Sequence, residues 1–222
     1  MQPEQLARRI LYEGRGLLAV DKPPDTPTSG RNLDDDDCLQ YWLMKRHGGM
    51  VWAVHQLDAD TSGVNLFVTQ RRLVAVMKAQ MARPSAQKRY LALVRGQPDW
   101  KDRTVHAPIG PVDERSLGIC DKGKAAHSQF TVLSRGNGAT LLDARIFTGR
   151  THQIRIHLAH LGHPVLGEEW YVRPPCLAHP RQALHAAKMQ LDDLELEAPL
   201  PQDLKDLMVE WEIEAPERLR AP

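Results

Sequence analysis

Residues 139–162, ATLLDARIFTGRTHQIRIHLAHLG, change from a strand pattern to a helix pattern across a short turn. Residues 139–147 are typical of a strand. In residues 151–161 apolar side chains recur at helical spacing, and Thr151 can cap the first turn of this helix. Gly162 is well placed to end it, because glycine readily adopts the left-handed conformation found at helix ends. The stretch therefore predicts a strand followed closely by a helix.

Similar patterns extend outward from this stretch in both directions. Strands are expected at residues 17–20, 51–54, 63–69, 89–95, 129–133 and 183–191. Helices are expected at residues 33–46, 71–81 and 201–211, with the acidic residues 34–37 in the first turn of the 33–46 helix. No steady strand–helix–strand rhythm appears, so the order favours an α+β fold with a mainly antiparallel sheet. We expect a single domain over residues 1–222.

Composition excludes several classes of protein. The chain has 222 residues, of which 42% are hydrophobic and 26% charged, as in ordinary globular proteins. No apolar run approaches the ~18 residues of a membrane helix, and the start lacks the apolar core of a signal peptide. The three cysteines lie far apart, which indicates free thiols rather than disulfides or a metal site: Cys38, Cys120 and Cys176. A cytoplasmic protein is expected.

The net charge of +1 is unevenly distributed. Residues 61–98 and 144–167 contain no acid but several arginines and lysines, whereas acids collect at residues 34–37 and 192–217. Such asymmetry permits one basic face that meets phosphates. The alternative is that these charges are scattered over solvated surfaces.

Residues 55–63, HQLDADTSG, lie between two expected strands, so Asp58 is presented by a loop that is held at both ends. Thr61, Ser62 and Gly63 suit a tight turn. Asp58 is therefore a candidate reactive carboxylate. Taken alone, the segment is more typical of an ordinary turn with a capping aspartate than of a reactive site.

Two further residues are candidates for chemistry. Arg155 lies one turn after Thr151 and off the apolar face of its helix, and a guanidinium beside a carboxylate keeps that carboxylate ionised. Tyr90 lies on the strand in KRYLALVRG, and its phenol can accept a proton if it lines a site. The simpler interpretations are a surface arginine and a core tyrosine.

A metal site is an alternative in the histidine-rich part of the chain. His157 and His160 have helical spacing, but His163 lies beyond the expected helix end, and no HExxH pattern occurs. A metal-dependent hydrolase using these histidines, with His152 and Glu168, is therefore the weaker hypothesis.

Together these segments resemble the RluA-type pseudouridine synthases. The likeness includes residues 55–63, residues 148–167 (TGRTHQIRIHLAHLGHPVLG) and KRYLALVRG from Lys88. LLAVDKP from Leu17, GKAA from Gly123 and RQALHA from Arg181 also fit the family's order. The resemblance runs from about Ile10 to about Leu204 and indicates the short form without an S4-like domain.

The resemblance implies a fold, an activity and a set of site residues. It implies the pseudouridine synthase catalytic fold, a mainly antiparallel mixed sheet flanked by helices, with a central RNA-binding cleft. It implies an RNA isomerase without cofactor or metal, acting on ribosomal or transfer RNA as a monomer. Asp58, Tyr90 and Arg155 are then catalytic. The residues expected to contact RNA are Lys22, Gln56, Lys88, Arg150, His152 and Gln153.

Two positions depart from the family pattern. Gln56 stands where the commonest pattern has arginine, so the positioning of RNA is expected to differ in detail. Asp25 stands where a glycine usually follows Lys-Pro-x, so the nearby loop is expected to differ. The competing hypothesis within the same fold is a non-catalytic RNA-binding module.

Overall fold

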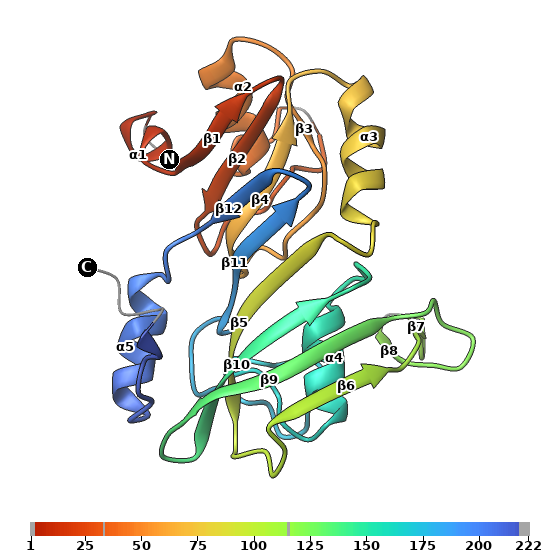
Figure 1. The fold of residues 1–222 in the computed structure, drawn as a ribbon, viewed down its shortest axis with the longest axis vertical. Helices are drawn as coiled ribbons and strands as arrows, with labels where there is room; N and C mark the ends of the chain where they lie inside the picture. The colour runs from red at the N-terminus through yellow and green to blue at the C-terminus, as the bar shows by residue number, and fades with distance from the viewer. Residues whose placement is uncertain (1–2, 33, 115, 218–222) are drawn as a thin grey trace. The chain divides into compact units, whose positions relative to one another are not determined.

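The computed structural model describes residues 3–32, 34–114 and 116–217. The chain folds as two compact units (Figure 1). Unit 1 contains the residues up to Gln87 together with Ala186–Pro199, and unit 2 contains Lys88–His185 together with the residues from Leu200 onward. The single domain and the central RNA-binding cleft stay predictions.

Unit 1 is a sheet with helices on both faces. Its strands follow the order β1-β2-β4-β11, with β3 paired to β4 and β12 paired to β11. The pairs β1–β2, β2–β4, β3–β4 and β11–β12 are antiparallel. The elements are α1 (Pro3–Ala7), β1 (Ile10–Gly14), β2 (Leu17–Lys22), α2 (Leu39–His47), β3 (Trp52–Ala53), β4 (Ser62–Val68), α3 (Arg72–Met81), β11 (Leu184–Leu191, from Ala186 on in this unit) and β12 (Leu194–Glu197).

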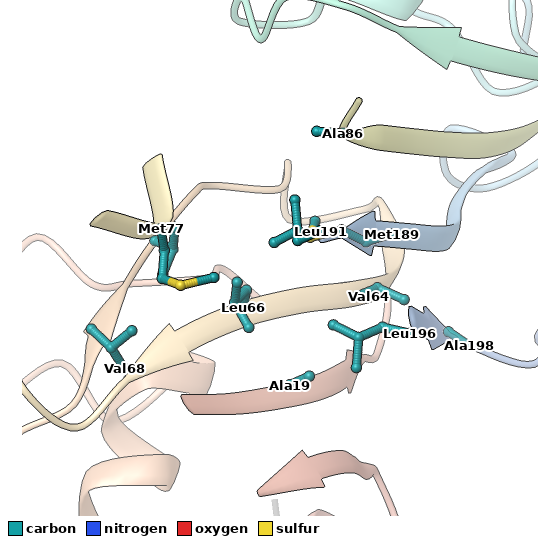
Figure 2. Close-up of a cluster of buried hydrophobic side chains, with 11 residues drawn as sticks. Ala19, Val64, Leu66, Val68, Met77, Ala86, Met189, Leu191, Leu196 and Ala198 are labelled. Atoms are coloured by element: carbon teal, nitrogen blue, oxygen red, sulfur yellow. The ribbon is translucent and has the colours of Figure 1, made fainter. Parts of the chain in front are cut away.

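The core of unit 1 has one apolar cluster on each face of this sheet. Successive strand residues point to opposite faces, so β2 sends Leu18 toward α1 and α2 and sends Ala19 to the other cluster. Figure 2 shows that other cluster, in which Leu66 of β4 lies near Met77 of α3 and Leu191 of β11. Strand β4 is buried along its whole length and therefore forms a fixed support for the loop before it.

Unit 2 is built on the antiparallel sheet β5-β10-β9-β6, with a separate β7–β8 hairpin. Helix α4 packs on one face, where its Gln153 and His157 side chains both bond to Ser128 Oγ of β9. The elements are β5 (Gln87–Arg95, from Lys88 on in this unit), β6 (Asp102–His106), β7 (Ile109–Pro111), β8 (Leu117–Ile119), β9 (His127–Arg135), β10 (Ala139–Ile146), α4 (Gln153–His160) and α5 (Gln202–Glu210).

The antiparallel pairing confirms the predicted α+β class, but two helix starts were predicted wrongly. The helix expected from Leu33, which lies outside the described residues, begins at Leu39. The acids before it form a turn instead, in which the Asp35 carboxylate accepts backbone N–H groups. Helix α4 begins at Gln153, and its N-cap is His152 rather than Thr151.

Helix ends and long strands agree better with the sequence. Gly48 and Gly162 both adopt the left-handed conformation at or just after the ends of α2 and α4, as their positions predicted. The sequence missed β1, β6, β7, β8 and β12, which are short. Among the described residues, no helix combines the length and the apolar character that a membrane crossing requires.

Candidate active site

Asp58 lies in unit 1, in the loop between β3 and β4, and is half-buried. The backbone N–H of Thr61 donates to Asp58 O at 3.0 Å, which closes a tight turn just after the carboxylate. The chain then enters the buried strand β4 at Ser62. The predicted loop with fixed ends is therefore present.

Lys22 fixes this loop through backbone carbonyls. Its side chain is 0% exposed, and its ammonium donates to three backbone carbonyls: Pro23 at 2.9 Å, Thr26 at 2.7 Å and Ala59 at 2.6 Å. Such a cage offsets the cost of burying the charge, since hydrogen bonds to charged groups are stronger than neutral ones. Lys22 thereby fixes the residue next to Asp58, and its expected contact with RNA stays a prediction.

A second set of contacts ties the loop to residues 25–28. Thr28 Oγ1 donates to Leu57 O at 3.1 Å and accepts from Leu57 N at 3.0 Å. Thr26 N donates to Ala59 O at 3.1 Å. These bonds fix the backbone on both sides of Asp58, so its carboxylate is presented by a rigid loop.

The loop that begins at Asp25 shows why a glycine is usual there. Asp25 has a φ of 53°, in the left-handed region that most side chains avoid. Aspartate tolerates this region better than most residues, because its short polar side chain can bond locally. The departure from the family pattern therefore keeps a backbone conformation that glycine would also adopt.

The two ends of the Asp58 loop are fixed by His55, which precedes Asp58, and by Gly63, which follows it. His55 Nε2 accepts from Leu66 N at 3.2 Å, and His55 O accepts from Asn65 Nδ2 at 3.2 Å. Gly63 has a φ of 105°, and a Cβ atom there would lie 2.2 Å from Ala186 O. Only glycine fits this close approach between β4 and β11.

Gln56 is exposed beside this loop. Its amide bonds to Ser29 Oγ, with Nε2 donating at 3.0 Å. An amide offers neither the charge nor the planar fork of arginine. Gln56 therefore offers neutral hydrogen bonding only, and its contact with RNA stays a prediction.

Unit 2 carries Tyr90 on β5, with its side chain buried. Lys88 lies two residues earlier on the same face and is also buried, and desolvation lowers the pKa of its ammonium. Arg89 points to the opposite face, where it forms an ion pair with Asp143. Lys88, expected to contact RNA, is thus mostly withdrawn from solvent.

Arg155 is deeply buried and forms a two-pronged ion pair with Glu168. Nε donates to Oε2 at 2.8 Å and Nη2 donates to Oε1 at 3.0 Å, with 2% and 0% of the two side chains exposed. Burial alone would raise the pKa of Glu168, but the Arg155 bond and charge, with two backbone N–H groups, lower it overall. The sequence predicted Asp58 as the carboxylate beside Arg155, and it considered Glu168 only as a metal ligand.

The Glu168 carboxylate also organises the segment that follows. Its Oε1 accepts from Trp170 N at 2.9 Å and from Tyr171 N at 3.3 Å. The two aromatic rings lie over the Arg155 guanidinium, at 5.0 and 5.3 Å from the ring centres. This cluster was not predicted from the sequence. Glu168 is the first acid after the acid-free residues 144–167, and this position could have indicated a partner for Arg155.

The start of α4 is fixed by Gln153, which is buried. Its Oε1 accepts from Thr148 Oγ1 at 2.7 Å and from Arg150 N at 3.1 Å, and its Nε2 donates to His127 O at 3.0 Å. These bonds make Gln153 an anchor for the start of α4, and its expected contact with RNA stays a prediction. Arg150 and His152 lie nearer the surface, and Arg150 Nε donates to Ala125 O at 2.9 Å.

The histidines of this region have partners other than a metal. His157 bonds Ser128 Oγ at 2.9 Å and Ala107 O at 3.0 Å, and His163 Nδ1 contacts Arg95 O at 3.2 Å. Across residues 3–32, 34–114 and 116–217, no group of three potential ligands is placed to hold a metal ion. The hydrolase hypothesis therefore has no support in the described part of the chain.

Comparison with known proteins places these features in a family. A family model described as RNA pseudouridylate synthase matches residues 16–160. The ribosomal large subunit pseudouridine synthase D of Nitrosomonas europaea is 33% identical and is aligned over 93% of this chain and 66% of that protein. An uncharacterized RNA pseudouridine synthase of Bacillus subtilis, YhcT, is 33% identical over 92% of this chain and 72% of that protein.

Solved structures agree with these matches. Human RNA pseudouridylate synthase domain containing 1 superposes with a TM-score of 0.76 at 26% identity, over 96% of both chains. Human RNA pseudouridylate synthase domain containing 4 has a TM-score of 0.81 at 22% identity, over 97% of both chains, and shares the fold. The chain therefore belongs to the RNA pseudouridylate synthases, enzymes that isomerise uridine in RNA to pseudouridine.

Proposed function

We propose that this chain isomerises specific uridines of structured RNA, ribosomal or transfer, and that Asp58 is the reacting carboxylate. The observation that carries the proposal is the loop of Asp58, which Lys22 and Thr28 fix through backbone atoms on both sides of the carboxylate. A rigidly held reactive group loses little entropy on reaching the transition state. The names of the relatives favour ribosomal RNA of the large subunit as the first substrate to test.

In this proposal Asp58 acts at C1′ of a uridine that has left the stack. The C1′–N1 bond breaks, the uracil turns, and a C1′–C5 bond forms. Asp58 either attacks C1′ as a nucleophile or removes a ribose proton to give a glycal, and both roles need the ionised carboxylate. Flipping costs a few kcal/mol, and less in a loop than in a duplex.

One carboxylate is enough for this chemistry. Glycosidases use two, because one must protonate the leaving oxygen. Uracil leaves as a delocalised anion and needs no such proton, so Asp60 has no required catalytic role. The reaction neither oxidises nor hydrolyses its substrate, and we propose that it proceeds without cofactor or metal.

Tyr90 and Arg155 complete the proposed machinery. Tyr90 stacks on the uracil and takes part in removing the C5 proton after the new bond has formed. Arg155 keeps the reacting carboxylate ionised, and Glu168 fixes the direction of its guanidinium. Gln56, Arg150 and His152 contact RNA directly, whereas the buried Lys22, Lys88 and Gln153 position the segments that do.

The two units serve as one catalytic domain in this proposal, and the protein acts as a cytoplasmic monomer. Pseudouridine mapping of total RNA from cells with and without this gene tests the proposal. We expect a small number of uridine positions to lose the modification when the gene is absent. Identical maps, with RNA binding retained by the purified protein, would instead favour a non-catalytic RNA-binding module.

A further inference from the structure

Trp170 is a large aromatic side chain that lies on the surface of unit 2, with 61% of its area exposed. Single exposed apolar residues are common, so exposure alone indicates nothing. Trp170 differs because its backbone and its ring are both held in place. An exposed ring that is already ordered can bind a partner at little entropic cost.

Trp170 is held by the buried ion pair between Arg155 of α4 and Glu168, which follows the helix. The backbone N–H of Trp170 donates to Glu168 at 2.9 Å, and the Arg155 guanidinium lies 5.0 Å from the indole centre. The ring of His152 lies 5.3 Å away at a tilt of 55°. His152 is fixed in turn by a 2.6 Å bond between Nδ1 and the hydroxyl of Tyr171.

The segments around this ring are rich in positive charge. Arg150 lies before His152 and is bonded to Ala125 O, next to Lys124. Tyr171 packs against the apolar cluster of the β7–β8 hairpin, which brings this hairpin to the same part of unit 2. Arg173 follows and donates to Glu169 O at 2.9 Å, while the exposed Glu169 carboxylate is an acid in the same segment. Along these segments the cations Lys124, Arg150 and Arg173 outnumber the exposed acid Glu169.

An aromatic ring among cations is the combination that binds single-stranded nucleic acid, because bases stack on rings while arginine and lysine meet phosphates. A protein partner would more typically cover a broader apolar patch. We propose that Trp170 is a stacking platform for a nucleobase of the RNA substrate other than the uridine that reacts. The proposal rests on the proposed RNA substrate and adds a residue that contributes affinity rather than chemistry.

Binding of a 12-nucleotide oligouridylate tests the platform without requiring turnover. Trp170→Ala is expected to raise Kd about 5- to 150-fold, which corresponds to the loss of one base–aromatic stack. Trp170→Phe keeps a ring and is expected to stay within about threefold of the wild type, but to lose most of the RNA-induced quenching of tryptophan fluorescence. Trp100→Phe, in the β5–β6 connection, is the matched control and keeps both affinity and quenching.

Two results would overturn the proposal. One is a Kd of Trp170→Ala within about twofold of the wild type. This result would mean that the exposed ring does not bind RNA and would favour a protein partner for this surface. The other is an equal loss of binding in the Phe and Ala variants, which would mean that Trp170 only supports Arg155. With substrate RNA, the stacking role raises KM and leaves kcat nearly unchanged, whereas displacement of Arg155 would lower kcat. If the wild type binds through Trp170 yet forms no pseudouridine, the proposed activity fails and the platform stands.

Discussion

Replacing Glu168 by glutamine tests the buried pair that organises α4 and the segment after it. The carboxylate accepts from Nε and Nη2 of Arg155 and from the backbone N–H groups of Trp170 and Tyr171. A glutamine amide has one oxygen, so its NH2 group must face at least one of these donors. Breaking one partner of a buried pair costs about 3–5 kcal/mol, because the other charge stays buried and uncompensated. We expect Glu168→Gln to lower the free energy of unfolding by this amount at neutral pH.

The same variant predicts a pH dependence. The pKa of Glu168 is lowered from its ordinary value of 4.5 in the folded protein. The carboxylate therefore contributes stability that is fully present above pH 4.5 and is lost as the pH falls through the lower folded pKa. The difference between wild type and Glu168→Gln should be constant from about pH 7 to pH 5 and shrink below pH 4.5.

Urea denaturation followed by circular dichroism at several pH values measures this difference. Glu169→Gln is the matched control, because the neighbouring Glu169 is exposed and should change stability by less than about 0.5 kcal/mol. A loss below about 1 kcal/mol for Glu168→Gln, or a loss that does not change on acidification, would contradict the assigned ion pair.

Three further predictions concern the Asp58 loop and the proposal that the reaction needs no metal. Lys22→Met removes the ammonium that donates to three carbonyls, of which Ala59 O keeps the Thr26 N–H as a donor, and should cost about 2–4 kcal/mol and reduce turnover, as measured by urea denaturation and single-turnover assays. Gly63→Ala places a Cβ 2.2 Å from Ala186 O and should cost about 3 kcal/mol or more, whereas Gly149→Ala, where a Cβ meets nothing within 4 Å, should not. A metal chelator should leave the rate of pseudouridine formation unchanged. If the chelator abolished activity and added zinc restored it, the metal-dependent hypothesis would be supported instead.

The sequence predicted those helices and strands in which the spacing of apolar residues matches the side chains that are buried. Helix α3 and strands β2 and β4 were expected nearly where they lie, because their apolar residues recur at the right spacing. Strand β6, DRTVH, was missed because it is mostly exposed and polar, so only its pairing with β9 defines it. The start of α2 was placed too early, because Asp35 turns the chain in a way that the acidic run does not reveal.

The sequence predicted the loop that presents Asp58, but not the contacts that fix this loop. Asp58 was expected on a loop held at both ends, and the structure describes such a loop. The anchoring role of Lys22 and the pairing of Arg155 with Glu168 were not foreseen. Both depend on tertiary contacts, since Lys22 bonds a carbonyl 37 positions away, and spacing along the chain does not encode such contacts.

Product formation by Asp58→Asn tests the central claim most directly. Asparagine keeps the size of the side chain but removes the charge that either proposed role requires. We expect the variant to bind large-subunit ribosomal RNA with a Kd within about threefold of the wild type, and to form no detectable pseudouridine in single-turnover mapping. Pseudouridine at the wild-type positions, formed by folded Asp58→Asn protein, would show that another group carries out the reaction.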